Sequence, residues 1–411
     1  MSKRDRFDCR AALAAVFLLA FGARVFAAGA PNDTSSGEMP KIDQLPAVKE
    51  LPDPFTFRDG SKVRTKQDWD RRRHELLELV QYYEYGHLPP EGAGATKVVA
   101  QEIWSRGGAS RDPFAEKRIL LGVGPEGKVQ VPLDLTIPKG KGPFPVIIKG
   151  DLCWGKVKEP IVQEILKRGY VLAEFDRTYV ASDSANKSKG IYSSYPESDG
   201  AALAMWAWGF HRVADYLLTQ DFIDKEKIVV TGHSRGGKAA LLAGATDERV
   251  TLTVPNGSGA GGAGCFRLTP ADAESLERIQ TSFPYWFVPR FKEFIGHVDQ
   301  LPFDQHEVKA LVAPRALLST EGLGDVWANP SGTQQTYLAA KEVYKFLGAP
   351  EKIGIHFRPG KHEQGEEDWK ALLDFADWQL RGKQPAQAFD KLAFPEQEKH
   401  YSWGAPRGER K

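Results

Sequence analysis

Cysteine and methionine are scarce in this sequence of 411 residues, with three of each, and the positive and negative charges almost cancel. Cys9 falls in the N-terminal segment described below, which leaves Cys153 and Cys265. These two can form at most one disulfide, which cannot replace a hydrophobic core in a chain of this length. A formal net charge of +1 gives no support for a nucleic acid or an anionic membrane as a partner. We expect a monomer.

Motifs for metals and nucleotide cofactors are also missing. The stretch that begins at His362, His-Glu-Gln-Gly-Glu, lacks the second histidine of the zincin pattern, and the two remaining cysteines lie far apart in sequence. The Gly-rich residues 257–264 follow the strongest motif of the chain instead of an early strand, which disfavours a dinucleotide loop. We therefore expect neither a metal nor a cofactor.

Long apolar runs are absent except near the start of the chain, where residues 11–21 are apolar. They follow a basic stretch formed by Lys3, Arg4, Arg6 and Arg10, and small residues lie at 25–30. This order is typical of a signal peptide over residues 1–30, since the run is too short to span a bilayer comfortably. Residues 31–50 are polar and contain proline, which predicts a flexible lead-in. The mature protein is expected to be secreted or periplasmic.

A strand, a tight turn and a helix are predicted over residues 227–245. Residues 227–231 are mostly apolar and β-branched, and residues 238–245 are rich in Ala and Leu. Between them Gly232-His-Ser-Arg-Gly236 fits the pattern G-x-S-x-G, in which a sharp turn exposes a nucleophilic serine. The alternative is a Gly-rich turn with a serine of no special role. The flanking strand and helix favour Ser234 as a nucleophile.

Strands and helices alternate along most of the chain. Antiparallel strands are expected at 97–105, 117–123 and 129–137, and buried strands at 145–149, 170–175, 227–231, 250–254, 313–320 and 352–357. Helices are expected at 68–83, 161–168, 201–218, 238–245, 334–347 and 366–380. Such alternation predicts a three-layer α/β sandwich with a mostly parallel sheet, here over residues 51–385, followed by a tail at 386–411. The aromatic-rich residues 266–305 predict a cap over this sheet.

A serine hydroxyl becomes a good nucleophile when a base takes its proton and an acid orients the base. His362 is the best base, because it follows the last predicted strand and precedes the last helix. Asp325, beyond the end of the penultimate strand, is favoured as the acid over Glu321. The alternatives are a surface histidine and a turn carboxylate. The backbone N–H of Arg235 is placed to stabilise an oxyanion, and its guanidinium either adds a donor or faces solvent.

At these residues the chain resembles the bacterial branch of the glucuronoyl esterases, carbohydrate esterase family 15, within the α/β-hydrolase superfamily. The matching stretches are Gly232-His-Ser-Arg-Gly-Gly-Lys238, residues 258–267, Phe283-Pro-Tyr-Trp-Phe287, residues 301–315, Asp325-Val-Trp327-Ala-Asn-Pro330 and residues 362–369. The resemblance implies an α/β-hydrolase fold. It also implies a serine esterase that cleaves the ester between 4-O-methyl-glucuronic acid on xylan and lignin alcohols.

The resemblance assigns roles to individual side chains. It implies that Arg235 contributes its side chain to the oxyanion hole and that Lys238 binds sugar hydroxyls. It places Trp327 against the sugar, and Gln280 falls where the family often has a sugar-binding glutamine.

The chain also departs from the family pattern. Many members carry the acid as Glu just before the Ser-Gly-x-Gly-Gly run, where this chain has Gly257, so the acid role moves to Asp325. Fungal members have a cysteine before the nucleophile and another after the base, where this chain has His233 and Glu363. His233 is expected to face away from the site. An acetyl xylan or feruloyl esterase, and an inactive carbohydrate-binding homologue suggested by Gly257, stay as alternatives.

Overall fold

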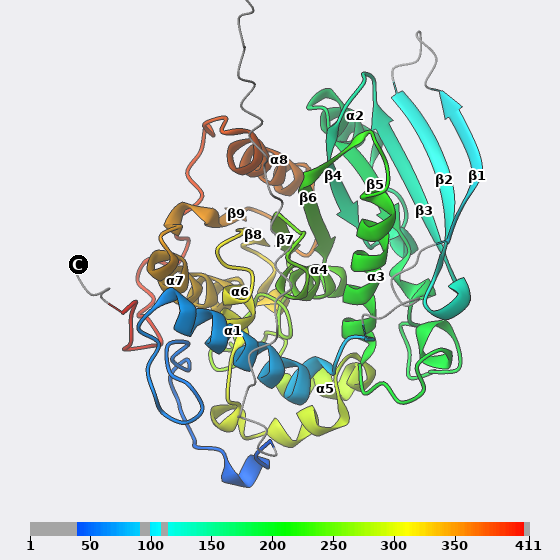
Figure 1. The fold of residues 1–411 in the computed structure, drawn as a ribbon. Helices are drawn as coiled ribbons and strands as arrows, with labels where there is room; N and C mark the ends of the chain where they lie inside the picture. The colour runs from blue at the N-terminus through cyan, green and yellow to red at the C-terminus, as the bar shows by residue number, and fades with distance from the viewer. Residues whose placement is uncertain (1–38, 91–98, 108–113, 407–411) are drawn as a thin grey trace, which may run out of the picture. The chain divides into compact units, whose positions relative to one another are not determined.

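Aliphatic runs predicted as strands pair into one sheet in the computed structural model, which describes residues 39–90, 99–107 and 114–406 (Figure 1). The expected signal peptide at 1–30 lies outside the described residues. The chain divides into the units Met1–Met39 and Pro40–Lys411.

Within the described ranges the sheet has nine strands in the order β1-β2-β3-β5-β4-β6-β7-β8-β9. The strands are β1 (Val99–Gly107), β2 (Phe114–Val123), β3 (Val129–Pro138), β4 (Phe144–Lys149), β5 (Val171–Phe175), β6 (Ile223–His233), β7 (Leu252–Asn256), β8 (Ala316–Gly322) and β9 (Ile353–Arg358). The pairs from β1 to β5 are antiparallel, and those from β5 to β9 are parallel. The predicted α/β class and mostly parallel sheet are confirmed.

Helices cover both faces of the sheet (Figure 1). They are α1 (Lys66–Val80), α2 (Glu159–Lys167), α3 (Ala202–Leu217), α4 (Arg235–Thr246), α5 (Leu276–Ser282), α6 (Gln305–Ala310), α7 (Pro330–Leu347) and α8 (Glu366–Arg381). Apolar side chains of α2 and α8 bury against one face of the central strands, as Ile165 and Leu372 do against Ile147 and Val254. Helices α3, α4 and α7 lie on the opposite face, so the central strands are apolar on both sides.

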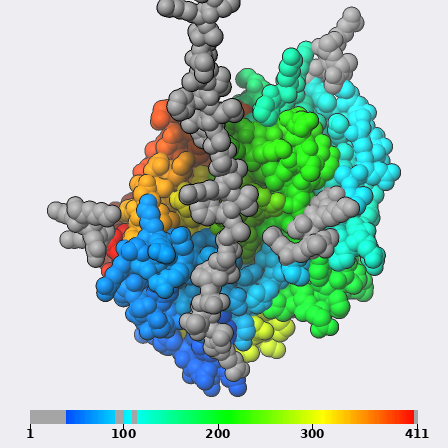
Figure 2. All heavy atoms as spheres, in the orientation of Figure 1, coloured from blue at the N-terminus to red at the C-terminus, as the bar shows by residue number. Residues whose placement is uncertain are grey.

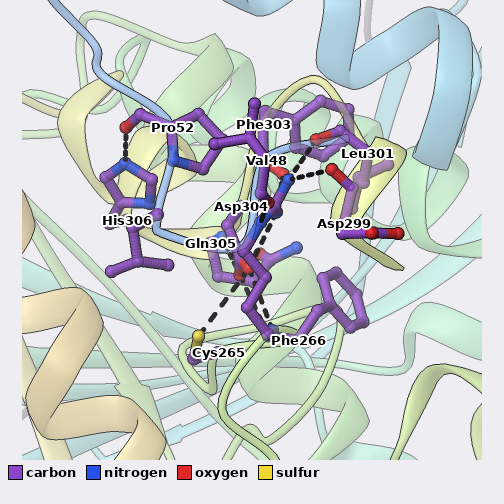
Figure 3. A network of polar contacts seen from close by, with 12 residues as sticks. Val48, Pro52, Cys265, Phe266, Asp299, Leu301, Phe303, Asp304, Gln305 and His306 are labelled. Carbon is purple, nitrogen blue, oxygen red and sulfur yellow. Dashed lines mark hydrogen bonds and ion pairs between the residues drawn. The ribbon is translucent and has the colours of Figure 1, made fainter. Parts of the chain in front are cut away.

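The predicted cap at 266–305 contains α5 and three short 3₁₀ turns, and its two ends are tied together. Asp304, which caps the N-terminus of α6, accepts from the backbone N–H of Phe266 at 3.0 Å and of Arg267 at 3.1 Å. The Arg267 guanidinium donates to the carbonyl of Phe303 at 2.9 Å. Figure 3 shows this network closing around Asp304. Because both of its ends are fixed, the segment 266–305 forms a compact cap.

Residues 40–50 and 386–406, from two segments predicted to lie outside the domain, belong to the compact unit. Leu45 and Tyr401 are buried, and the backbone N–H of Val48 donates to Asp299 at 2.7 Å. Gln334 and Gln335 on α7 bond the backbone of the C-terminal segment between residues 393 and 400. The structure therefore begins the domain at residue 40 instead of 51 and packs residues 386–406 against it. Isolated apolar residues without periodicity give no sequence signal for such packing.

Figure 2 shows green atoms of the α3–α4 region between the cyan edge strands and the orange C-terminal segments.

None of the helices in the described ranges combines the length and hydropathy needed to cross a bilayer. Cys153 and Cys265 are both free thiols. Among the described residues, no cluster of three or more His, Cys, Asp or Glu side chains is arranged to hold a metal ion.

Candidate active site

Ser234 stands at a strained turn between β6 and α4. Its φ of 54° and ψ of −124° are unusual for a residue with a side chain. The turn around it is too tight for side chains. A Cβ on Gly232 would lie 2.3 Å from the carbonyl oxygen of Gly236, and one on Gly236 would lie 1.9 Å from Oδ1 of Asp151. A rigid strand and helix hold the strain, as a nucleophile elbow requires.

His362 and Asp325 are brought together by the two loops that follow β9 and β8. His362 Nδ1 lies 2.6 Å from Asp325 Oδ2. The carboxylate is buried, whereas the imidazole is partly exposed. The backbone N–H of Gly324 donates to the carbonyl of Gly360 at 2.8 Å, which ties one loop to the other. With Nδ1 held by a carboxylate, Nε2 is the nitrogen that can exchange a proton with a hydroxyl.

Glu321 lies elsewhere. It is fully buried within β8, and its charge partner is Lys309 of α6. Burial raises the pKa of Glu321 and lowers the pKa of Lys309, while each charge partly offsets the effect on the other. The geometry thus pairs His362 with Asp325, the carboxylate that the sequence favours.

The surroundings of Gly257 explain why this chain lacks the glutamate that many family members carry at this position. It has a φ of 48°, and a Cβ there would lie 3.3 Å from Asp325 Oδ2 and 3.6 Å from Cε1 of His233. A side chain at 257 would therefore enter the space that the Asp325 carboxylate occupies. The loops after β7 and β8 approach the same point, and this chain fills it from the second loop.

The Arg235 side chain is held by Asp183, a residue that the sequence analysis did not identify. Its Nη1 donates to Oδ2 of Asp183 at 2.8 Å, and Asp183 Oδ1 accepts from the indole N–H of Trp286 at 2.9 Å. The guanidinium carbon lies 4.6 Å from the ring centroid of Trp286 and 4.7 Å from that of Phe283. Within the described part of the chain, its buried Nε has no hydrogen-bond partner. A fixed cation with a free N–H is a suitable donor for an oxyanion.

Lys238 has its three N–H donors committed to the protein. Its buried Nζ donates to the carbonyls of Ser258 at 2.6 Å and Ala260 at 2.5 Å, and to Glu274 Oε2 at 2.7 Å. Burial lowers the pKa of Lys238, and the Glu274 carboxylate counteracts this. Lys238 therefore orders the Gly-rich loop in this structure. Its predicted role in binding sugar hydroxyls stays a prediction. It requires a sugar hydroxyl to replace one of these three acceptors.

Gln280 and Trp327 have the features expected of ligand-binding residues. Gln280, on α5, is 6% exposed, and its Nε2 is buried without a hydrogen-bond partner among the described residues. An orphaned buried donor costs stability unless a ligand or water bonds it. Trp327, two residues after Asp325, is 43% exposed. The Glu274 backbone N–H donates to the Trp327 carbonyl at 2.9 Å, which connects this loop to the cap.

The expectation that His233 faces away is wrong. Its ring centroid lies 4.4 Å from that of His362, with the rings tilted by 47°. His233 Nδ1 lies 2.6 Å from Oδ1 of Asn256. Burial lowers the pKa of His233 to about 4, and the nearby His362 adds to this effect. A neutral His233 therefore packs against the imidazole of His362. The one sequence signal for this contact is the position of His233, which lies next to the candidate nucleophile at the end of a strand.

Residues 124–348 match the family model described as the fungal glucuronyl esterases. The chain is 33% identical over 393 residues to the carbohydrate esterase MZ0003 of an unknown prokaryotic organism, which covers 81% of this chain and 90% of that protein. This chain belongs to the glucuronoyl esterase family. It is also 34% identical over 324 residues to a 4-O-methyl-glucuronoyl methylesterase of Podospora anserina, covering 75% of this chain and 63% of that one.

A solved glucuronoyl esterase of carbohydrate esterase family 15, from Caldicellulosiruptor kristjansonii, has the same fold. It superposes with a TM-score of 0.74 at 35% sequence identity, covering 89% of this chain and 99% of that one. The resemblance to glucuronoyl esterases and the α/β-hydrolase fold are therefore confirmed. The protein is a carboxylic ester hydrolase of this family.

Proposed function

We propose that the protein hydrolyses the ester between 4-O-methyl-glucuronic acid side chains of xylan and lignin alcohols, through an acyl-enzyme on Ser234. The observation that carries the assignment of residues is the 2.6 Å contact between His362 Nδ1 and Asp325 Oδ2, with His362 packed against His233, the neighbour of the strained Ser234. Family membership supports the substrate class, because a relative named 4-O-methyl-glucuronoyl methylesterase is 34% identical.

In the first half-reaction, Ser234 Oγ attacks the ester carbonyl while His362 Nε2 takes the hydroxyl proton. Asp325 holds the imidazole and stabilises the positive charge that it gains. The negative oxygen of the tetrahedral intermediate accepts hydrogen bonds from the backbone N–H and the free Nε–H of Arg235. Collapse of the intermediate breaks the bond to the alcohol oxygen, which takes its proton from His362.

In the second half-reaction, His362 takes a proton from water, and the resulting hydroxide-like oxygen attacks the acyl-enzyme. A second tetrahedral intermediate forms in the same oxyanion site. Its collapse releases glucuronic acid, which loses its proton to water, and His362 returns its proton to Ser234 Oγ. Each half-reaction therefore moves one proton through His362, and the two together return the enzyme to its starting state.

The sugar is proposed to bind on the side of the cap and the Trp327 loop. The buried Nε2 of Gln280 supplies an N–H without a protein partner, and the half-exposed Trp327 offers a flat apolar face to a sugar ring. Lys238 supports this side by ordering the Gly-rich loop. The inactive homologue that Gly257 suggests loses its rationale, because Asp325 supplies the carboxylate from the next loop.

The decisive experiment compares methyl and benzyl esters of glucuronic acid with acetylated xylan as substrates. We expect hydrolysis of both glucuronate esters, and release of acetate alone would support the acetyl xylan esterase alternative. Ser234→Ala is expected to reduce kcat by about 10⁴- to 10⁶-fold, because the acyl-enzyme can no longer form. Unchanged turnover in this variant would contradict the proposal.

We also propose that the mature protein is exported and acts as a monomer. The support for export is the basic start, apolar run and small residues of the first 30 positions. N-terminal sequencing of the secreted or periplasmic fraction and light scattering of the purified protein test the two points. A retained N-terminus in the cytoplasm, or a stable dimer, would contradict them.

A further inference from the structure

Trp154, like Trp327, is an exposed aromatic residue near the catalytic histidine, and it has no part in the proposed mechanism. It lies in the short turn Leu152–Trp154 after β4 and is 50% exposed. Its ring centroid lies 6.2 Å from that of His233, edge to face. His233 in turn contacts His362. Trp154 is therefore separated from the proposed proton donor to the leaving group by a single ring.

A buried arginine holds this ring in place. The Arg177 guanidinium carbon lies 4.4 Å from the ring centroid of Trp154 and 4.9 Å from that of Trp206. Arg177 itself is fully buried, and its Nη1 donates to Oδ1 of Asp151 at 2.6 Å and to the carbonyl of Gly150 at 3.1 Å. The Arg235 guanidinium carbon lies 5.8 Å from the same centroid, so two cations contact Trp154, an attractive arrangement for an indole ring. Half of the side chain stays open to solvent.

The chemistry of the ester decides which part of the substrate meets Trp154. The xylan chain is attached to the sugar, so it leaves the site on the acyl side, where Gln280 and Trp327 lie. The alcohol oxygen takes its proton from His362, so the alcohol must lie beside that imidazole. Tyr179, which is 52% exposed, lies in the turn Arg177–Tyr179, and this turn packs against that of Trp154. Two exposed aromatic residues, Trp154 and Tyr179, therefore lie on adjacent turns.

We propose that Trp154 forms the subsite for the aromatic ring of the alcohol leaving group. The inference rests on the proposed esterase function. A flat, immobilised and half-exposed ring recognises another aromatic ring by offset or edge contacts, at little cost in side-chain freedom. An ester of a small aliphatic alcohol gains nothing from such a surface. Trp154 thus makes the enzyme select aryl alcohols over alkyl alcohols.

The test is the ratio of kcat/KM for benzyl and methyl esters of glucuronic acid, measured for the wild type and Trp154→Ala. The variant is expected to lower this ratio by roughly tenfold, the size of a lost aromatic contact. Trp154→Phe keeps a ring over Arg177 and is expected to retain most of the ratio. Trp154→Leu, apolar but not flat, is expected to behave like Trp154→Ala and replaces it where that variant does not fold.

Trp327→Ala is the matched control, since it removes a similarly exposed indole from the proposed sugar side. It is expected to lower kcat/KM for both esters alike and to leave the ratio unchanged. If the Trp154 variants lower both esters equally, or neither, the subsite is refuted while the esterase proposal stands. If the wild type hydrolyses neither ester, the esterase proposal fails and the subsite fails with it.

Discussion

Gly257 faces the Asp325 carboxylate from the adjacent loop. A Cβ on Gly257 would lie 3.3 Å from Asp325 Oδ2, the oxygen that contacts His362 Nδ1 at 2.6 Å. The Asp325 carboxylate reaches the imidazole, and a side chain at 257 would enter the space that this carboxylate occupies. The glycine at 257 therefore leaves room for the aspartate, and His362 still has a carboxylate partner.

Asp325→Asn is expected to lower kcat on benzyl glucuronate by about 10⁴-fold, because an amide favours the wrong tautomer of His362 and cannot stabilise its positive charge. Glu321→Gln is the matched control, since Glu321 is fully buried and its charge partner is Lys309. We expect it to leave kcat close to the wild-type value. Steady-state kinetics of both variants check the assignment, and the opposite order would make Glu321 the acid.

Moving the carboxylate between the loops tests their convergence. Asp325→Ala should be nearly inactive, and adding Gly257→Glu should recover at least about tenfold of the lost kcat by bringing a carboxylate to His362 from the other loop. In the wild-type background, Gly257→Glu should reduce activity. It crowds Asp325 and places a side chain at a φ of 48°, which costs roughly 1–2 kcal/mol. A double variant no more active than Asp325→Ala would show that the loops do not substitute for each other.

The parts of the site that follow from local sequence could be predicted. The elbow is formed by contiguous residues, and the chain order of nucleophile, acid and base pointed to Asp325 and His362, whose side chains the structure brings into contact. Buried strands such as β4 are continuous apolar runs, and Val146, Ile147 and Ile148 are completely buried.

Contacts made by irregular loops could not be predicted. Asp183 reaches Arg235, and Arg177 reaches Trp154, from a loop that has no periodicity and no motif. Lys238 was assigned through resemblance alone, which could not show that its donors are used by the Gly-rich loop. Such pairings depend on where the sheet places distant loops, and a single sequence does not carry that information.

His233 is expected to make the folded protein sensitive to acid. Its pKa in the folded protein is about 4, below the usual 6.5, so the unfolded chain binds the proton more readily. The contribution of neutral His233 to stability is complete above pH 6.5 and is lost as the pH falls toward 4. The difference corresponds to at most about 3 kcal/mol. His233→Phe, which keeps a ring against His362, should show a smaller loss of unfolding free energy between pH 7 and pH 5 than the wild type. An equal loss in denaturant titrations would contradict this.

The contact between Asp183 and Arg235 is expected to matter more for catalysis than for binding. Asp183→Ala releases the guanidinium from its 2.8 Å partner, so the donor is no longer fixed where the oxyanion forms. We expect kcat on benzyl glucuronate to fall by about tenfold or more with little change in KM. Arg235→Ala should lower kcat by about 10²- to 10³-fold, because an oxyanion donor is lost outright.

The double variant separates positioning from an independent role. If Asp183 acts through Arg235, then Asp183→Ala should have no further effect once Arg235 is alanine, and the two losses will not add. Arg235→Lys should rescue little, since a point charge on a flexible stem cannot reproduce the fixed N–H geometry of a guanidinium. Additive losses in the double variant would instead mean that Asp183 contributes to catalysis by a route that does not involve Arg235.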